Sequence, residues 1–276
     1  MTNLAQRVAV GVVAIPIIYF LCMAGGPYFF GFVAVVSAVA LREFYALAEA
    51  KGARPLLMLG IAGGFVVNLS FFIHAAAFIN LASRPILVTA LLVLVIASTL
   101  WELFRKPDSR SSALLNLSTT LFGVLYVSLF FGTLIGVREI AGGYMVMSMF
   151  VTIWICDSAA FHVGSSMGRH KLFPRVSPNK TWEGAIAGLI FAILTAVAAK
   201  HFVLGFLPMS GAIVIGVIVG TVGQMGDLAE SLMKRDAGVK DSSTLIPGHG
   251  GAFDRFDSIL LVAPCVYLYL EYVLFP

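Results

Sequence analysis

The sequence predicts an all-α, polytopic membrane protein with about nine transmembrane helices. Of its 276 residues, 59% are hydrophobic and only 12% are charged, and the mean hydropathy is +0.96. A soluble domain of this length needs more polar surface than that. Apolar runs of about 20 residues, the length that crosses a hydrocarbon core about 30 Å thick, recur from end to end. Lys and Arg are also distributed unevenly between the loops.

The expected spans cover residues 8–26, 29–48, 56–76, 85–104, 113–136, 143–163, 182–203, 208–230 and 255–274. The first run is longer than the core of a usual signal peptide and eight more follow, so we interpret it as a mature helix. We expect two regions. Residues 1–140 hold about five spans and little polar chemistry, whereas residues 141–276 form a catalytic region with two long polar loops.

The basic residues predict the orientation. With the N-terminus in the cytoplasm, alternation places 15 of the 18 Lys and Arg residues on the inner side, and leaves Arg84, Arg138 and Lys200 outside. This split follows the positive-inside rule and puts the C-terminus on the opposite side of the membrane from the N-terminus. The net charge of +4 therefore indicates topology and not nucleic-acid binding. Glu43, near the inner end of the second span, is interpreted as an interfacial anchor, like its neighbours Arg42 and Glu49.

The eighth span continues into a polar helix face. Three glycines at positions 216, 220 and 223 predict a small-residue face that admits a close helix neighbour. Further along, one polar stripe recurs every three or four residues and consists of Gln224, Asp227, Glu230 or Ser231, and Lys234. A solvated helix end would account for Glu230, Lys234 and Arg235. It would not account for Asp227, because an unpaired carboxylate at headgroup depth is costly.

Two more carboxylates open the ninth span. Asp254 and Asp257 share a face if that helix begins near Gly251. Capping explains one carboxylate at a helix N-terminus but not two. Together with Asp227 they predict a hard-cation site, because Mg²⁺ prefers oxygen ligands and keeps waters that a phosphate can replace. We expect one Mg²⁺, or two cations in the two-metal manner.

The other polar loop predicts an anion site. Ser177 and Pro178 are a suitable N-cap and first residue for the seventh span, and Lys180 adds a positive charge there. Asp157, inside the inner end of the sixth span, is an intramembrane carboxylate and hence a functional candidate. His249 lies among glycines that allow close approach of a ligand, and structural and functional interpretations of it are equally supported. A cation site beside cationic side chains at the lipid surface indicates phosphate chemistry on a membrane-embedded substrate.

The C-terminal half resembles the phosphatidate cytidylyltransferase family, also called CDP-diacylglycerol synthases. The resemblance lies in Ser231, Lys234-Arg235, Lys240-Asp241 and the run from Leu245 to Asp257, with fixed spacing over 27 positions, and in the second block SPNKTWEG at 177–184. It is strong over about the last 120 residues, and in the rest only the pattern of spans is similar. One departure is Ala252, where the family has a larger aliphatic residue.

The resemblance implies that CTP and phosphatidic acid give CDP-diacylglycerol and pyrophosphate, with Mg²⁺, at the cytoplasmic face of a bacterial inner membrane. It also implies residue roles. The expected metal ligands are Asp227, Asp254 and Asp257. The expected catalytic residues are Lys180, Lys234, Arg235, Lys240, Asp241, His249 and Arg255. The expected substrate-binding residues are Ser177, Asn179, Thr181, Ser231 and Asp157. Membrane lipids are further expected partners, as is a second copy of the chain in a homodimer.

Two alternatives stay open at this point. The first keeps the chemistry but changes the lipid, giving a CTP-dependent enzyme that acts on a polyprenol or another lipid alcohol. The second is an ion-coupled transporter, which often has duplicated halves with binding sites near the midplane. The acidic residues here gather at the inner boundary of the C-terminal half only, which disfavours transport. A CDP-alcohol phosphotransferase is also disfavoured, because Asp157 is followed by Ser-Ala-Ala and not by that family's expected pattern.

Overall fold

The computed structural model describes residues 3–76, 83–106, 112–245 and 250–275, and nearly all of them are helical. The α-helices are α1 (Asn3–Ala24), α2 (Gly26–Ala50), α3 (Leu57–Ala76), α4 (Ser83–Phe104), α5 (Ala113–Gly123), α6 (Phe130–Ala141), α7 (Gly143–Met167), α8 (Trp182–Phe202), α9 (Met209–Ile218), α10 (Gln224–Asp236) and α11 (Ala252–Tyr269). Three π-helical segments are continuous with them, namely η1 (Val124–Leu129), η2 (Val219–Gly223) and η3 (Leu270–Leu274). Two short strands, β1 (Lys171–Phe173) and β2 (Ser177–Thr181), form an antiparallel hairpin.

Each expected span corresponds to one continuous helical rod. Seven rods in the described residues are long and apolar enough to cross a membrane, and two shorter apolar helices cover Val10–Ala24 and Leu57–Ile73. The nearly all-α membrane fold that the sequence predicts is therefore confirmed. The count of nine crossings, the orientation and the division at residue 140 stay predictions.

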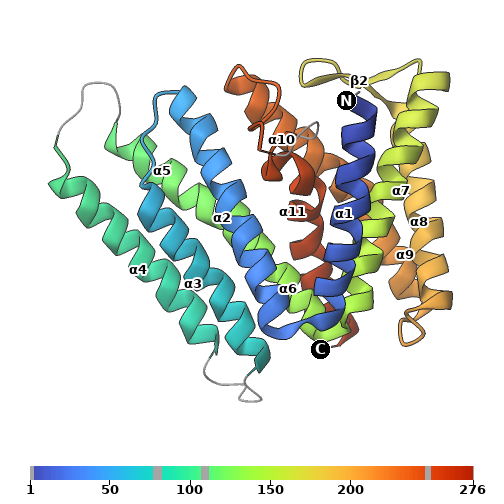
Figure 1. Ribbon diagram of the computed structural model, residues 1–276, viewed down its shortest axis with the longest axis horizontal. Helices are drawn as coiled ribbons and strands as arrows, with labels where there is room; N and C mark the ends of the chain where they lie inside the picture. The colour runs from blue at the N-terminus through green and yellow to red at the C-terminus, as the bar shows by residue number, and fades with distance from the viewer. Residues whose placement is uncertain (1–2, 77–82, 107–111, 246–249, 276) are drawn as a thin grey trace.

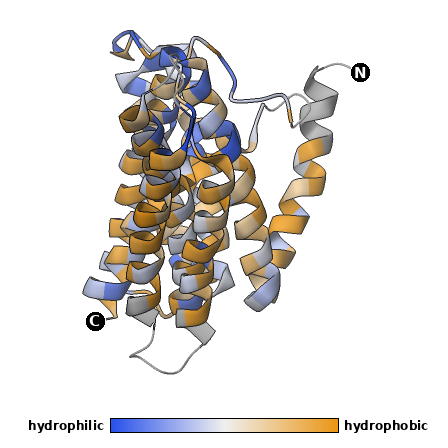
Figure 2. Cartoon of the chain, turned by 90° about the vertical axis from the view of Figure 1, so that its left-hand side faces the viewer, coloured by the Kyte–Doolittle hydropathy of each residue, from blue (hydrophilic) through white to orange (hydrophobic). Residues whose placement is uncertain are grey.

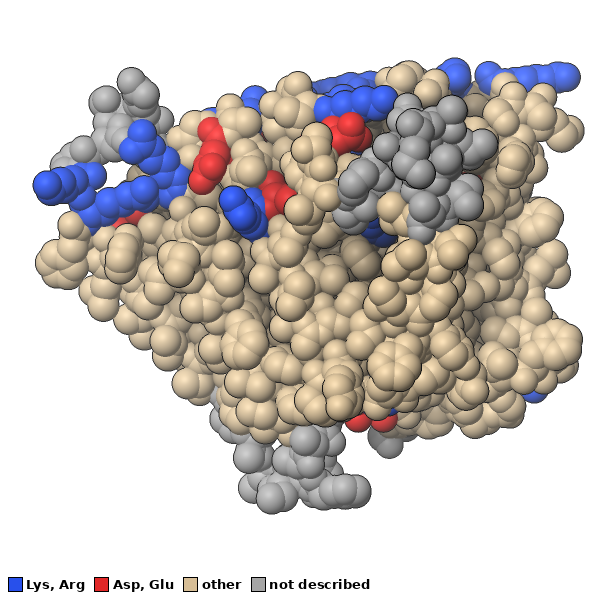
Figure 3. Space-filling model, in the orientation of Figure 1, with Lys and Arg blue, Asp and Glu red and all other residues tan. Residues whose placement is uncertain are grey.

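The rods lie side by side, and the two termini are at opposite ends of the bundle (Figure 1). Hydrophobic residues cover the length of the rods, whereas hydrophilic residues concentrate at one end (Figure 2). Lys and Arg gather along the same end in Figure 3. We call this end, which carries the β1–β2 hairpin, the last turns of α10 and the first turn of α11, the basic end. The uneven spread of charge along the bundle agrees with the split expected from the positive-inside rule.

Glycines bring the C-terminal helices together. A Cβ atom added at Gly216 would lie 2.6 Å from Ile193 Cα, and one at Gly220 would lie 2.8 Å from Leu189 Cα, so α9 and η2 pack directly on the backbone of α8. The predicted small-residue face is thus confirmed for these two residues. Gly223 instead faces Val262 of α11, at 3.3 Å from its added Cβ atom. The π-helical turn of η2 rotates the chain and takes Gly223 off the face that the regular helical period predicts.

The start of α8 differs from the prediction. Ser177 is not its N-cap, because residues 177–181 form β2 and Ser177 pairs with Phe173 of β1. The N-cap is Thr181, whose Oγ1 accepts a hydrogen bond from the backbone N–H of Gly184 at 3.2 Å. Proline is tolerated in such an edge strand, so Pro178 does not mark a helix start here. The hairpin and this cap place Lys180 directly before α8 at the basic end.

Candidate metal and phosphate site

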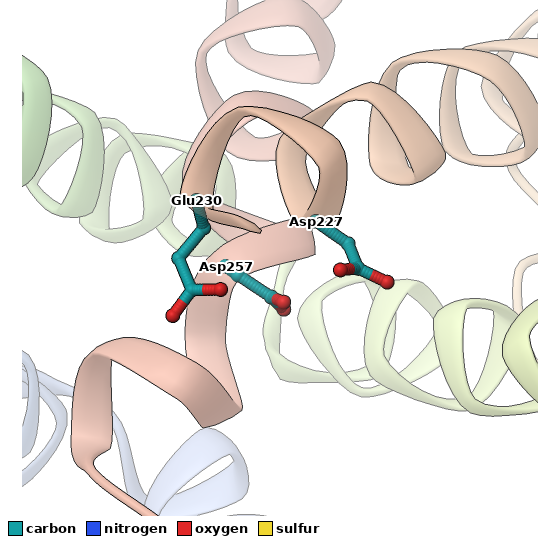
Figure 4. A group of neighbouring side chains, drawn as sticks. All are labelled: Asp227, Glu230 and Asp257. Carbon is teal, nitrogen blue, oxygen red and sulfur yellow. The ribbon is translucent and has the colours of Figure 1, made fainter. Parts of the chain in front are cut away.

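Three carboxylates from two neighbouring helices converge at the basic end. Asp227 and Glu230 lie on α10 and Asp257 lies on α11, and one oxygen atom of each is within 4.8 Å of the other two (Figure 4). The helices can approach because of Gly226, where an added Cβ atom would lie 2.6 Å from the carbonyl oxygen of Asp257. The π-helical segment η2 ends directly before α10, and such segments are frequent at functional sites.

Glu230 is part of this group, although the sequence favoured a solvated helix end for it. Only 1% of its surface is exposed. Its Oε2 atom lies 2.6 Å from Lys234 Nζ, and its buried Oε1 atom has no hydrogen-bond partner among the described residues. The prediction failed because the face of α10 that carries Glu230 packs against α11, and only the opposite face of its last turns reaches solvent. For Arg235, which is exposed and donates to the carbonyl oxygen of Val239 at 3.0 Å, the solvated interpretation is confirmed.

Lys180 brings a positive charge to the carboxylate group. Its Nζ atom lies 2.7 Å from Asp227 Oδ2, and about a quarter of its side chain is exposed. Ser231 donates a hydrogen bond to the other oxygen of Asp227, at 3.3 Å. Asp157 of α7 is within electrostatic range of Asp227, Asp257 and Lys180. The structure therefore brings together four residues from separate segments of the sequence, namely Asp157, Lys180, Asp227 and Asp257.

Asp254 has a different set of contacts from Asp257, although both lie in the first turns of α11. Its Oδ1 atom is 2.6 Å from Lys234 Nζ, and its Oδ2 atom accepts from the backbone N–H of Gly251 at 2.7 Å and of Ser242 at 2.9 Å. As the third residue of the helix it bonds back to the backbone N–H of the N-cap Gly251, which is the half of a capping box that a glycine N-cap allows, and this confirms the predicted start of the helix. Metal binding by Asp254 stays a prediction, and a cation there would compete with the ammonium group of Lys234.

The other expected site residues lie near the same end of the bundle but outside the group formed by Asp227, Glu230 and Asp257. Arg255 is exposed on α11 and is within electrostatic range of Asp157. Lys240 and Asp241 are exposed in the segment that follows α10, and Asn179 is exposed in β2. Ser177 is half-buried in β2, and Thr181 is buried as the N-cap of α8. His249 lies outside the described residues.

Glu43 is a polar residue of this region that sequence analysis assigned to interfacial anchoring. It is buried on α2, and its carboxylate accepts hydrogen bonds from the backbone N–H groups of Ala252 and Phe253, the first two residues of α11. An anchor would have reached solvent instead. The signal that could have found it was its position within an apolar run, where a carboxylate is functional by default.

The donor set fits a hard divalent cation. Carboxylate oxygens are the ligands that Mg²⁺ prefers, and the Oε1 atom of buried Glu230, which finds no partner in the described part of the chain, is an acceptor that a cation or its water could satisfy. Lys180 and the surrounding cationic side chains add positive charge at the same membrane boundary. Such an arrangement can bind polyphosphate and stabilise the charge that develops during phosphoryl or nucleotidyl transfer.

Comparison with known proteins identifies relatives along the whole chain. The sequence model of the cytidylyltransferase family matches residues 5–273. A phosphatidate cytidylyltransferase of Bacillus subtilis is 30% identical over 272 residues, 98% of each chain, and one of Synechocystis is 31% identical over 298 residues, 98% of this chain and 97% of the relative. One of Haemophilus influenzae is 42% identical over 137 residues, 48% of each chain. The chain belongs to the cytidylyltransferase family.

Proposed function

We propose that the protein is a phosphatidate cytidylyltransferase that converts CTP and phosphatidic acid into CDP-diacylglycerol and pyrophosphate. The observation that carries the proposal is the convergence of Asp227, Glu230 and Asp257 beside Lys180, at the basic end of an apolar bundle in a chain of this family. The basic end would face the cytoplasm of a bacterial inner membrane, where CTP is available and the lipid phosphate lies at the same depth as the carboxylates.

The three converging carboxylates would hold Mg²⁺. A bound Mg²⁺ would neutralise phosphate charge and orient the reacting oxygens, and a second ion would make this a two-metal site. Glu230 thus joins the expected ligands Asp227 and Asp257. Asp254 stays a proposed ligand, with the competition from Lys234 noted above.

The reaction requires the protein to align the reacting atoms and to neutralise phosphate charge. The phosphatidate oxygen is already an anion, so it can attack the α-phosphorus of CTP without a general base. A new bond forms between that oxygen and the α-phosphorus, and the bond from the α-phosphorus to the oxygen that bridges it to the β-phosphorus breaks, releasing pyrophosphate. Lys180 lies where it can bind a phosphate, because it adjoins Asp227 and remains partly exposed. Arg255, Lys240 and Arg235 are exposed cations at the same end, and we propose that they contact the CTP phosphates.

The glycine face of α9 and η2 does not support homodimer formation. The glycine face of α9 and η2 packs on α8 of the same chain, so it is not a free surface for a second copy. A homodimer remains a proposal that rests on the resemblance alone.

Pyrophosphate release by the purified, detergent-solubilised protein tests the function. We expect release with CTP, phosphatidic acid and Mg²⁺, and none after EDTA is added. Release with a polyprenol but not with phosphatidic acid would move the assignment to the other lipid. No release with either lipid, from folded protein, would contradict the proposal and favour the transporter alternative.

Variants of the carboxylates localise the activity. We expect Asp227→Asn and Asp257→Asn to reduce turnover at least a hundredfold, because each removes a charged ligand. Asp236→Asn is a matched control, since Asp236 also lies on α10 but pairs with Lys51 at the surface, at 3.4 Å. Full activity of Asp227→Asn and Asp257→Asn would remove the site from the mechanism.

A further inference from the structure

We propose that Glu43 is a positioning residue for the candidate metal site. Its buried carboxylate fixes the start of α11 and the segment at 242–243, and thereby sets how Asp254 and Asp257 face α10. The inference rests on the proposed function, because it concerns the same carboxylates. Glu43 belongs to α2, only 6% of its surface is exposed, and the groups that it binds lie 199 to 210 residues away in the sequence.

Both oxygen atoms of Glu43 have two donors within reach. Oε1 accepts from Ser243 Oγ at 2.6 Å and from the backbone N–H of Ala252 at 3.2 Å. Oε2 accepts from the backbone N–H of Phe253 at 2.7 Å and lies 3.1 Å from Ser242 Oγ. The first N–H groups of a helix have no partner within the helix, and the helix dipole favours an anion there. Glu43 supplies that anion from another helix, and its own burial is compensated by these bonds.

Ser242 connects Glu43 with the capping carboxylate of α11. Its Oγ atom lies 2.8 Å from Asp254 Oδ2 as well as 3.1 Å from Glu43 Oε2, and its single hydroxyl proton can be donated to only one of them at a time. Gly251 provides a second, independent sign of the close fit. A Cβ atom added at this position would overlap both the Ser242 hydroxyl and the Glu43 carboxylate.

The depth at which α11 begins sets the place of Asp257. This residue lies in the second turn of the helix, and its backbone carbonyl packs on Gly226 of α10. If the chain of α11 moved by one residue relative to α10, Asp257 would rotate by about 100° and turn away from Asp227 and Glu230. A residue that fixes the start therefore controls the geometry of the metal ligands without touching the metal.

Binding of Mn²⁺ alone tests this role apart from turnover. We would titrate purified, detergent-solubilised protein with Mn²⁺ and follow the free ion by electron paramagnetic resonance. We expect Glu43→Gln to weaken Mn²⁺ binding about 10- to 100-fold, since the amide offers only one acceptor oxygen and faces the N–H donors with its own N–H₂ group. Glu49→Gln, an exposed position on the same helix, is the matched control and should bind as the wild type does. Gly251→Ala disturbs the same contact from the α11 side and should weaken binding similarly.

The outcomes separate the two proposals. Glu43→Gln that is less stable to heat but binds Mn²⁺ within twofold of wild type would make Glu43 a stabilising residue only, and would overturn the inference. If Glu43→Gln does not fold, unchanged Mn²⁺ binding by Gly251→Ala would overturn it as well. Wild-type protein that neither binds Mn²⁺ nor releases pyrophosphate with Mg²⁺ would instead overturn the proposed function, and the positioning role with it.

Discussion

Replacement of Lys234 by Met should destabilise the fold more than any single surface change. The ammonium group lies 2.6 Å from Glu230 Oε2 and 2.6 Å from Asp254 Oδ1, and the exposed fractions of the three side chains are 11%, 1% and 3%. Without it, two buried carboxylates face each other with no counter-charge. Removing one partner of a buried ion pair costs about 3–5 kcal/mol of the free energy of unfolding. At about 2–4 °C per kcal/mol for a chain of roughly this size, the melting temperature should fall by about 6–20 °C.

Thermal unfolding in detergent, followed by circular dichroism, measures this effect. Lys240→Met is the control, because Lys240 is exposed and its loss should change the free energy of unfolding by no more than about 0.5 kcal/mol. The double variant Lys234→Met/Glu230→Gln should regain part of the loss, since only one charge is then left unpaired. A melting temperature of Lys234→Met within 2 °C of the wild type, with turnover abolished, would refute the reasoning. It would favour the alternative that Lys234 serves the substrate phosphates.

Two further predictions concern packing and capping. Gly226→Ala should cost about 1–3 kcal/mol and weaken Mn²⁺ binding, because the new methyl group would lie 2.6 Å from the carbonyl oxygen of Asp257 and force α10 and α11 apart. Gly31→Ala on α2, where an added Cβ atom meets no described residue within 4 Å, is the control for both measurements, and equal behaviour of the two variants would contradict the close approach. Thr181→Ala should lower the free energy of unfolding by about 0.5–2 kcal/mol through loss of the α8 N-cap. Thr181→Ser should restore it, and a failure of Ser to do so would argue against the cap.

The hydrophobic runs predicted the helices well because, in lipid, a spanning segment must satisfy its own backbone hydrogen bonds. Composition and length then fix helix type and approximate bounds. The β1–β2 hairpin was not predicted, since three to five residues paired by backbone groups leave little pattern in the side chains. Ser177 and Pro178 are as compatible with an edge strand as with a helix cap.

The sequence predicted most residues of the candidate site, but it did not predict which of them are buried or which neighbours they contact. Asp227, Asp257 and Lys180 stand out because charge at membrane depth is costly, and the structure brings them together. Glu230 and Glu43 were assigned to solvated or anchoring roles, because periodicity gives the face of a residue but not the neighbour that covers it. Their burial is decided by tertiary packing, of α11 on α10 for Glu230 and of the α11 start on α2 for Glu43.

The π-helical segment η2 changes the neighbour that the continuous helix of α9, η2 and α10 packs against. Gly216, before the segment, and Gly220, within it, lie against α8, whereas Gly223, at its end, and Gly226, beyond it, lie against α11. One extra residue in a turn of a continuous helix shifts the face of every later residue by about 100° relative to the regular helical period of the sequence. A single rod thus serves two partners without a loop, whose unsatisfied backbone groups would be costly inside the bilayer. Deletion of one residue within 219–223 would convert this wide turn into a regular α-helical turn and leave the acidic face against α11, whereas deletion of one residue in the regular turns of α9 would rotate that face by about 100°.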